Sequence, residues 1–373
     1  MKIYDTNCLI DNPSLIQKNK DEIIVPFIIL DELDGLKNSK NVGYNARTVL
    51  RAIKKYNIKC QNFKLSEQVV DKALLDICRI HELELITGDY RVYLEGKENN
   101  IKCEHYQPDI NTYTGVVKRK LTPDEYNQLQ EHNSVGWSKE KLHENQYVDC
   151  DSILARYRSG TLHKVSWSNK HKIQGIDELN RRQVMAYDAI FNPDITTVIL
   201  WGVAGTGKTA LAIKSAIQLA QQERYSNVLL SRPNVQIGEE LGILPGGIKE
   251  KQDPFIKPFE DNMKSFQMKT VPEIQPLQTA KGRDIKDTFF IIDEAQDIEP
   301  DKMKMLVERM GKGSKLVLTG DVRQVDKRGL SPAYNGLSFV ANRLKGSRLT
   351  ACVELDKVER SESAKELGEL LRR

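Results

Sequence analysis

The 373-residue sequence predicts an α/β protein with two parallel-sheet domains joined by a small β-rich connector. Short apolar runs of strand type alternate with stretches of helical apolar spacing over 1–107, and again from Ile173 onward. A glycine-rich loop at 202–209 joins an apolar run to a helical stretch. Two apolar runs end in the same Thr-Gly-Asp triplet, at 87–89 and 319–321. Each triplet places a carboxylate at the carboxyl edge of a sheet, where open α/β folds bind ligands.

The front of the chain gives six expected elements. Each strand is a short apolar run, and each helix shows apolar residues recurring every three or four positions. Strands are expected at 2–4, 22–25 and 83–87, and helices at 27–37, 45–56 and 71–83. This alternation is typical of βαβ units and therefore of a parallel sheet.

The middle of the chain changes character, and the α/β rhythm then resumes. Strands are expected at 112–121, 146–151, 152–159 and 161–167, with a capped helix beginning at Thr122. Further strands are expected at 196–201, 227–231, 287–293 and 315–321, with a helix at 208–221. The predicted domains are therefore 1–107, a connector at 108–170, and 171–373.

Composition restricts the class of protein. Apolar residues make up 39% of the chain and aromatic residues 7%, which suits globular cores. The formal net charge of +4 does not by itself indicate a polyanion partner. Six scattered cysteines without a C-x-x-C pair fit a reducing compartment. The longest apolar run, 23–30, is too short for a membrane span, and Asp5 interrupts any leader-like segment, so a cytoplasmic protein is expected.

The loop GVAGTGKT has the G-x-x-x-x-G-K-[ST] pattern between a strand and a helix, which is the context that supports such a match. Its backbone N–H groups would surround a phosphate, with the lysine on the β/γ oxygens and the final hydroxyl on Mg²⁺. The predicted nucleotide-binding residues are Gly202, Val203, Ala204, Gly205, Thr206, Gly207, Lys208 and Thr209.

A second acidic strand end completes the expected ATP site. In FFIIDEAQD, Asp293 would contribute to the Mg²⁺ shell and Glu294 would polarise the attacking water. Gln324 follows a third core strand and is expected to sense the γ-phosphate, whereas Asp321 is expected to shape that loop. Gln183, upstream of the phosphate loop, is expected to read the adenine edge.

Residues 173–360 resemble the PhoH family of P-loop ATPases, which is related to superfamily-one helicases and implies a RecA-like fold. The matching stretches are VAGTGKT, SRPNVQIGEELGILPG, DPFIKP, FFIIDEAQD, KMKMLVERMGKGSKLVLTGDVRQVD and ELDKVERS. The resemblance implies that Arg232 and Arg360 sense phosphate. Asp297 stands where the family commonly has Asn.

Four carboxylates of the front domain stand at expected element ends, where a parallel sheet would bring them to one edge. They are Asp5, Glu32, Asp71 and Asp89. Carboxylates in one cleft repel one another, and hard divalent ions with oxygen ligands would compensate their charge. The alternative is that these acids are ordinary helix caps, and Asp76 competes with Asp71 for the same role.

The surrounding sequence makes the metal interpretation more specific. The stretches DTNCLID, ILDELDGLK and DKALLDICRIHELELITGD resemble the PIN domain, a metal-dependent ribonuclease fold. The resemblance implies that the four carboxylates bind the metal, with Thr6 or Asn7 in support. Asp31 and Asp34 flank Glu32 but have no counterpart in the pattern.

Together the two halves resemble the PIN–PhoH tandem proteins. The resemblance implies an ATP-dependent enzyme that moves along or unwinds single-stranded or structured RNA and cuts it. ATP and Mg²⁺ or Mn²⁺ are the implied cofactors, with a divalent ion at both sites. Arg360, beyond the last core strand, suggests an arginine supplied to a neighbouring subunit, and hence a homo-oligomer in the form of a hexameric ring. Two alternatives remain: an ATPase with a non-cleaving, RNA-binding PIN module, and a toxin-like ribonuclease gated by its ATPase.

Overall fold

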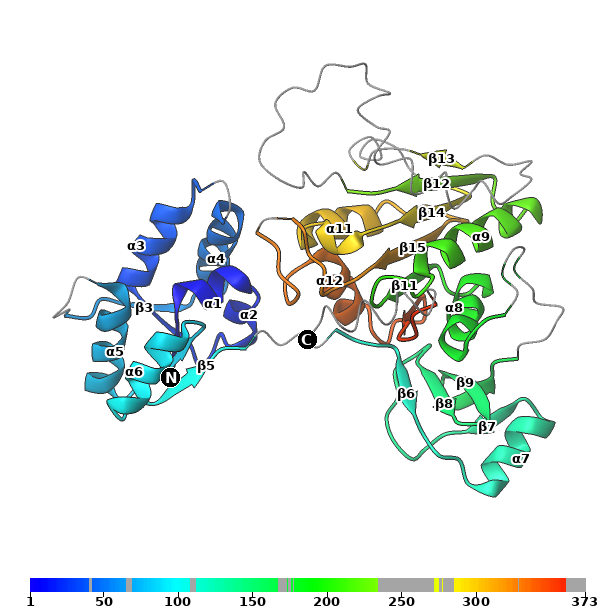
Figure 1. Ribbon diagram of the computed structural model, residues 1–373, viewed down its shortest axis with the longest axis horizontal. Helices are drawn as coiled ribbons and strands as arrows, with labels where there is room; N and C mark the ends of the chain where they lie inside the picture. The colour runs from blue at the N-terminus through cyan, green and yellow to red at the C-terminus, as the bar shows by residue number, and fades with distance from the viewer. Residues whose placement is uncertain are drawn as a thin grey trace, which may run out of the picture. The chain divides into compact units, whose positions relative to one another are not determined.

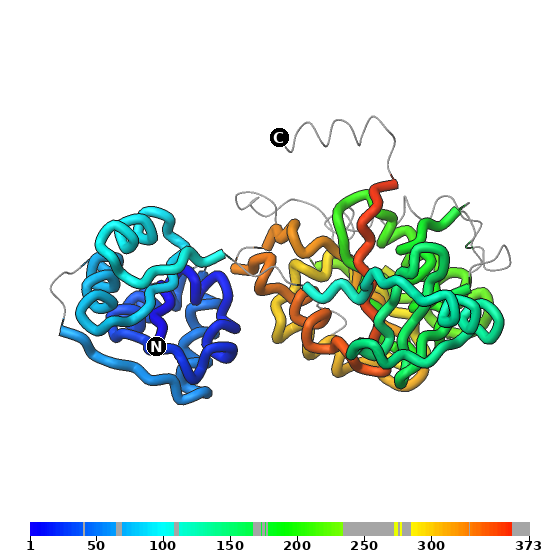
Figure 2. The backbone as a smooth tube through the Cα atoms, turned by 90° about the horizontal axis from the view of Figure 1, so that it is seen from below, coloured from blue at the N-terminus to red at the C-terminus, as the bar shows by residue number. Residues whose placement is uncertain are grey.

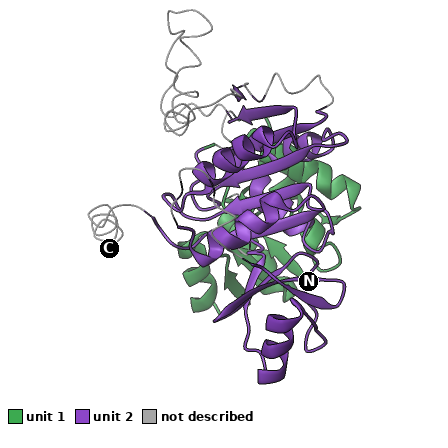
Figure 3. Cartoon of the chain, turned by 90° about the vertical axis from the view of Figure 1, so that its right-hand side faces the viewer, with its two compact units in different colours: residues 1–111, 327–334 green, residues 112–326, 335–373 purple. Residues whose placement is uncertain are grey.

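The computed structural model describes residues 1–39, 42–64, 69–107, 112–166, 173, 176, 178–233, 272–274, 277, 285–327 and 329–359. The chain divides into two compact units (Figure 3). Unit 1 comprises 1–111 with 327–334, and unit 2 comprises 112–326 with 335–373. The β-rich connector is thus grouped with the C-terminal part of the chain. In the described residues, no helix is long and apolar enough to cross a lipid bilayer.

Unit 1 is built on parallel strands, as expected. One sheet has the order β1-β4-β5 and a two-stranded sheet pairs β2 with β3. The strands are β1 (Lys2–Tyr4), β2 (Ile24–Pro26), β3 (Lys59–Gln61), β4 (Glu84–Thr87) and β5 (Cys103–His105). The helices are α1 (Thr6–Asp11), α2 (Leu15–Lys18), α3 (Phe27–Leu36), α4 (Gly43–Lys55), α5 (Val70–His81) and α6 (Tyr90–Glu98). Figure 2 follows this path from blue at β1 to cyan at β5.

The sequence reading missed five of these elements: α1, α2, α6, β3 and β5. The two strands have three residues each and show no run of apolar alternation, so periodicity could not reveal them. Helix α6 begins because the side chain of Asp89 accepts hydrogen bonds from the backbone of Arg91 and Val92. The chain therefore turns into a helix directly after the first Thr-Gly-Asp triplet.

The connector forms a five-stranded sheet of order β6-β8-β9-β10-β7. Its elements are β6 (Val116–Lys118), α7 (Pro123–Glu131), β7 (Ser134–Gly136), β8 (Tyr147–Cys150), β9 (Ile153–Arg158) and β10 (Thr161–Lys164). The expected capped helix is confirmed, because Thr122 and Glu125 form a reciprocal capping box at the start of α7.

The rest of unit 2 is a six-stranded parallel sheet of order β13-β12-β14-β15-β11-β16. Its strands are β11 (Thr197–Trp201), β12 (Asn227–Ser231), β13 (Glu273–Ile274), β14 (Thr288–Ile292), β15 (Lys315–Gly320) and β16 (Thr350–Glu354). The helices are α8 (Arg181–Phe191), α9 (Lys208–Gln221), α11 (Pro300–Val307) and α12 (Gly336–Arg343), with a short 3₁₀ turn η3 (Ala295–Asp297).

Helices cover both faces of this sheet, so the fold is a three-layer α/β sandwich (Figure 1). Alternate residues of one strand face opposite layers: Val198 and Leu200 pack with α8 and α9, whereas Ile199 packs with α11 and α12. Burial on both faces explains why these strands read as continuous apolar runs. The predicted P-loop type of α/β domain is confirmed. All six cysteines are free thiols.

Lys315, at the start of β15, is buried and caps the C-terminal end of α8. Its Nζ donates to the carbonyl oxygens of Ile190 at 2.6 Å, Asn192 at 2.7 Å and Ala189 at 3.4 Å. Because α8 ends here, no following helical turn supplies backbone N–H donors to these carbonyl oxygens. Burial lowers the pKa of Lys315 to about 7. The lysine therefore serves as the C-terminal cap of α8 from a neighbouring strand.

We expect Lys315→Met to lower the free energy of unfolding by about 3 kcal/mol, because the methionine keeps the apolar stem but removes the donor to the buried carbonyl oxygens of Ala189 and Ile190. Urea unfolding of the full chain measures this change. Lys312→Met, at an exposed position nearby, is the matched control and should change stability by less than about 0.5 kcal/mol. Equal effects of the two substitutions would refute the capping role.

Candidate functional site

The phosphate loop lies between the end of β11 and the start of α9, as the sequence predicted. Gly202 has φ +147°, and a Cβ there would lie 2.0 Å from the carbonyl oxygen of Leu355. Gly205 and Gly207 have φ +84° and +83°, in the left-handed region that favours glycine. The three glycines are therefore required by the path of the loop as well as by access of a phosphate to its backbone.

Lys208 begins α9 and turns its side chain onto the loop. Its Nζ donates to the carbonyl oxygens of Gly202 at 2.6 Å and Val203 at 2.9 Å, and the residue is buried. A phosphate held by the loop would offer the ammonium group anionic oxygens in place of these neutral ones. The Lys208 ammonium group thus already lies at the loop, and phosphate binding would only exchange its hydrogen-bond acceptors.

Thr209 and Asp293 meet across the sheet edge. The Thr209 hydroxyl donates to Asp293 Oδ1 at 2.9 Å, and the Thr319 hydroxyl donates to the same oxygen at 2.5 Å. Burial raises the pKa of Asp293, Glu294 adds to the rise, and the two threonine hydrogen bonds oppose it. A buried carboxylate next to a hydroxyl at the phosphate loop is the kind of oxygen set that Mg²⁺ prefers, so these residues fit the ion.

Glu294 has both carboxylate oxygens engaged. Arg232 Nη2 lies 3.0 Å from Oε1, and Gln296 Nε2 donates to Oε2 at 2.8 Å. The backbone of Glu294 is left-handed, with φ +50°, which is strained for a residue with a side chain. Each carboxylate oxygen of Glu294 accepts one hydrogen bond here and keeps a second lone pair that could accept from a water molecule.

Gln296 was not singled out by sequence reasoning, yet it connects the loop after β14 to the loop after β15 at this edge. Its Nε2 also donates to the carbonyl oxygen of Gln324 at 3.0 Å, and its Oε1 accepts from the backbone of Asp321 at 3.1 Å. A Cβ at Gly320 would lie 2.2 Å from that Oε1. The glycine of the second Thr-Gly-Asp triplet therefore makes room for this amide. The only sequence signal was its place, two residues after Glu294.

The loop that carries Gln324 is held by acidic side chains. Asp321 Oδ1 accepts from the backbone of Arg323 at 3.0 Å, and Asp297 Oδ1 accepts from the backbone of Asp326 at 2.8 Å. The prediction that Asp321 shapes this loop is confirmed. Gln324 follows β15 at the same edge as the phosphate loop, and its role at the γ-phosphate stays a prediction.

Gln183 lies beside the phosphate loop, but its side chain is engaged in two structural contacts. It forms a capping box with Asn180 at the start of α8, and its Nε2 donates to the carbonyl oxygen of Thr206 at 3.2 Å. These contacts join the helix start to the loop. The reading of adenine by Gln183 stays a prediction.

Glu359, the last described residue, also contacts the phosphate loop. Its N–H donates to the carbonyl oxygen of Gly205 at 2.9 Å, and its Oε1 accepts from Asn180 Nδ2 at 2.8 Å. The chain after β16 thus returns to its own nucleotide loop. Arg360 lies outside the described residues, so its role stays a prediction.

The acidic edge of unit 1 centres on Asp5, which is 3% exposed at the end of β1. Thr87 donates to Asp5 Oδ2 at 3.0 Å, and Thr6 donates to Glu32 Oε2 at 2.5 Å. Burial raises the pKa of Asp5 to about 6, Asp71 and Glu32 add to the rise, and the Thr87 hydrogen bond opposes it. Three carboxylates therefore share one electrostatic environment, which a cation would stabilise.

The other acids are used differently. Asp71 Oδ2 lies 3.7 Å from Arg91 Nη2. The competing candidate, Asp76, pairs instead with Arg79 on the same helix, with 2.5 Å between Asp76 Oδ1 and Arg79 Nη2. Asp71 raises the pKa of Asp5, so it shares the electrostatic environment of that carboxylate, and its role as a metal ligand stays a prediction. Asp89 Oδ1 accepts from the backbone of Arg91 at 2.8 Å, so this residue is also a helix cap, as the alternative interpretation held.

Two details concern the supporting residues. The Thr6 hydroxyl donates a hydrogen bond to Glu32, whereas Asn7 is exposed, and the support of a metal site by either residue stays a prediction. Asp34 pairs with Lys37 at the surface. In the described part of the chain, no three His, Cys, Asp or Glu side chains are placed to hold a metal ion as they stand. The four-carboxylate metal set therefore stays a prediction.

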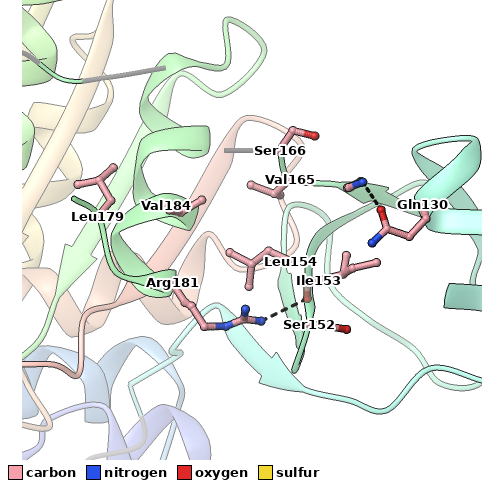
Figure 4. A pocket seen from close by; sticks show the side chains of 10 residues that line it. Gln130, Ser152, Ile153, Leu154, Val165, Ser166, Leu179, Arg181 and Val184 are labelled. Atoms are coloured by element: carbon pink, nitrogen blue, oxygen red, sulfur yellow. Dashed lines mark hydrogen bonds between the residues drawn. The ribbon is translucent and has the colours of Figure 1, made fainter. Parts of the chain in front are cut away.

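A cavity of about 410 Å³ lies between the start of α8 and the connector sheet (Figure 4). Ile153, Leu154 and Val184 form part of its apolar lining. Two cationic side chains line the cavity, but both bond to neighbouring protein atoms: Lys164 to Gln130, and Arg181 to the Asp149 carboxylate and the carbonyl oxygen of Ile153. The polar groups of this cavity therefore do not indicate an anion site.

Comparisons with known proteins cover the whole chain. The family model described as PhoH-like protein matches residues 175–371, and the one described as PIN domain matches residues 2–107. Protein PhoH2 of Bacillus subtilis is 28% identical over 99% of this chain and 100% of its own. Protein PhoH2 of Thermobispora bispora is 25% identical over 99% of this chain and 96% of its own. Among solved structures, the Pif1 helicase from Candida albicans matches 53% of this chain and 44% of its own at 16% identity. The TM-score of this match is 0.31.

Proposed function

Because the chain belongs to the PhoH-like protein family and carries a PIN domain at its front, we propose that it hydrolyses ATP to move along or unwind RNA and cleaves RNA phosphodiester bonds. The observation that carries the proposal is the junction of Thr209, Asp293 and Thr319 at the phosphate loop. It joins a loop hydroxyl to the acidic strand end, as phosphoryl-transfer sites require.

At the ATP site, each residue has a distinct task. Lys208 would bind the β/γ oxygens of the nucleotide, and the loop backbone would surround the phosphates. Thr209 and Asp293 would hold Mg²⁺, which supplies neutralisation of the phosphate charge. Glu294 would accept a proton from the attacking water. Release of its contact with Arg232 would make that arginine available to bind phosphate.

The second and third loops of this edge would report the state of the nucleotide. Gln324 would meet the γ-phosphate, and its backbone is linked through Gln296 to Glu294. Gln183 would combine its present contact with Thr206 and a contact to adenine. Loss of the γ-phosphate after hydrolysis would then change the position of all three loops, and this change is the source of movement along RNA.

At the nuclease site, Asp5, Glu32, Asp71 and Asp89 would hold Mg²⁺ or Mn²⁺. A bound divalent ion supplies a water nucleophile and neutralisation of the phosphodiester. Thr87 and Thr6 would orient Asp5 and Glu32 through the hydrogen bonds they make now. Burial is the main cause of the raised pKa of Asp5, and the neighbouring Asp71 and Glu32 add to it. A cation at this edge would offset both the burial of the charge and the repulsion among the three carboxylates.

Two observations favour an alternative for unit 1. Asp89 caps α6, and the described acids do not form a three-ligand group as they stand. A PIN module that binds RNA without cutting it would be consistent with that arrangement. The two functions differ in one measurable property, which is the appearance of shortened RNA.

The test is a single reaction of the full chain with ATP, Mn²⁺ or Mg²⁺ and end-labelled RNA, followed for released phosphate and RNA length. Both phosphate release and RNA shortening are expected, and chelator should stop both. Phosphate release without shortening would favour the non-cleaving alternative. No phosphate release would reject the ATPase assignment itself.

We further propose a homo-oligomeric, hexameric ring in which Arg360 completes the ATP site of a neighbouring subunit. An arginine supplied in trans is a known way to stabilise the charge of phosphoryl transfer. The contact of Glu359 with the chain's own Gly205 argues for the competing role, in which Arg360 serves the same subunit.

Mixing two inactive variants distinguishes these roles. Arg360→Ala subunits keep an intact phosphate loop, and Lys208→Ala subunits keep an intact Arg360. If Arg360 acts in trans, ATP hydrolysis should return on mixing, to a fraction of the unchanged rate. Absence of recovery despite proven subunit exchange, or a fully active monomer, would exclude the shared site.

A further inference from the structure

Three aromatic rings lie together where β5 ends and α6 begins. The ring of Tyr90 meets His105 edge-on, with centroids 5.4 Å apart and an interplanar angle of 86°. Tyr93 lies 5.6 Å from His105 and 6.0 Å from Tyr90. Edge-to-face contacts of this kind hold a ring in a fixed orientation. We call these three residues the Tyr90 platform.

The Tyr90 platform lies at the acidic edge of unit 1. In the sheet register, His105 stands opposite Thr87, the residue that donates a hydrogen bond to Asp5. Neighbouring residues in parallel register point to the same face of a sheet, so the histidine shares a face with that threonine. Tyr90 itself directly follows Asp89. The rings therefore flank the proposed metal site.

The exposure of Tyr90 calls for an explanation. Its side chain is 61% exposed, although it is fixed against two other rings, whereas Tyr93 packs partly against the core. A ring that served only the fold would gain more by burial. An exposed ring with restricted motion loses little conformational entropy when a flat partner stacks on it.

The charges around the rings indicate the kind of partner. Lys97 lies 5.6 Å from the centre of the Tyr93 ring, and the side chain of Arg91 is 75% exposed. Proteins bind single-stranded nucleic acids with aromatic side chains interleaved with cationic ones, because the bases stack on the rings and the phosphates pair with the cations. A purely apolar protein partner would gain nothing from the two cations.

We propose that the Tyr90 platform stacks on one unpaired base of single-stranded RNA beside the bond that is cut, with Lys97 at the adjoining phosphate. Every base has a flat face, so such a contact selects unpaired RNA and not a particular sequence. In this way the Tyr90 platform would place the RNA backbone beside Asp5 and Asp89. This inference rests on the proposed RNA cleavage and adds to it the way in which the substrate is held.

The test is a double-mutant cycle in which one change is Tyr90→Ala in the protein and the other is the removal of one base from the RNA. A set of end-labelled oligonucleotides carries an abasic nucleotide at each position around the cut, and kcat/KM for cleavage is measured with the full chain. Loss of the stacked base should slow the unchanged chain on the order of tenfold, and Tyr90→Ala should slow cleavage of intact RNA by a similar factor. The two changes together should cost no more than either one alone, because they remove the same contact.

Two further variants separate stacking from other roles. Tyr90→Phe keeps the ring and should retain nearly the full rate. Ile80→Ala removes another exposed apolar side chain of unit 1, 63% exposed on α5, and should leave cleavage unchanged. Thermal melting of each variant should match that of the unchanged chain.

Three results would overturn the inference. Cleavage by Tyr90→Ala at the unchanged rate would do so, and would leave a protein partner as the explanation of the exposed ring. Additive losses at every abasic position would show that Tyr90 and the base act independently. If the unchanged chain cuts no RNA, the proposed nuclease function fails and this inference fails with it, whereas the first two results leave that function intact.

Discussion

Lys208→Ala should reduce ATP hydrolysis about 10²- to 10³-fold, because it removes the cation that the transferring phosphate needs in a preorganised site. The side chain is buried and already bound to the loop carbonyls of Gly202 and Val203. The Lys208 ammonium group therefore already lies at the phosphate loop before a nucleotide binds. Steady-state phosphate release at saturating ATP measures the effect.

The control is Lys214→Ala, which removes a lysine from the same helix α9, one to two turns beyond the loop. This variant should hydrolyse ATP at the unchanged rate. Because Lys208 also donates to the loop, melting of Lys208→Ala should be compared with that of the unchanged chain. Hydrolysis by a folded Lys208→Ala near the unchanged rate would remove the phosphate-loop assignment.

Asp5→Asn should slow RNA cleavage at least about a hundredfold while the ATPase continues. The substitution keeps the size of the side chain and an oxygen that can accept from Thr87, but it removes one charge from the acidic edge. Loss of a residue that only supports a metal ligand costs 10- to 100-fold, so loss of a ligand's charge should cost at least as much. The cleavage rate at saturating Mn²⁺ is the measurement.

Asp34→Asn is the matched control for this change, since Asp34 stands on the same helix as Glu32 and pairs with Lys37 at the surface. It should cut RNA as the unchanged chain does. Sustained cleavage by Asp5→Asn, after purification that removes contaminating nuclease, would show that the metal site lies elsewhere. A parallel loss in both variants would point instead to a general effect of charge.

The features that could be predicted from the sequence are those that depend on residues close together in the chain. The phosphate loop was found because its glycines serve backbone angles that other residues rarely adopt, and Gly205 and Gly207 indeed have positive φ. The core strands were found because burial on both faces requires continuous apolar runs. Asp5 was found because a carboxylate that ends a parallel strand lies at the ligand-binding edge.

Sequence reasoning failed where function depends on contacts between distant loops. Gln296 joins Glu294, Asp321 and Gln324, and no spacing rule reports that the loops after β14 and β15 lie side by side. Helix α6 was missed because the residues after Asp89 were not read as helical, although the alternative interpretation had allowed Asp89 to be a helix cap. The Tyr90 platform depends in the same way on the register of β4 with β5, which brings His105 next to the acidic edge.

The two Thr-Gly-Asp triplets illustrate how one local pattern serves two arrangements. In the first, the threonine donates to Asp5 and the aspartate caps a helix. In the second, the threonine donates to Asp293, the glycine leaves room for Gln296, and the aspartate holds its own loop. In both cases the threonine hydroxyl orients the carboxylate of a neighbouring strand, which is a relation that a single sequence cannot display.

The central claim is that one chain contains two separate active sites, and the most direct test compares Lys208→Ala and Asp5→Asn in the same two assays. With unstructured RNA and Mn²⁺, Lys208→Ala should cut RNA while releasing almost no phosphate from ATP. Asp5→Asn should release phosphate at the unchanged rate while leaving the RNA intact. If either substitution abolishes both activities in a chain that still melts normally, or if neither affects its own activity, the account of two sites is contradicted.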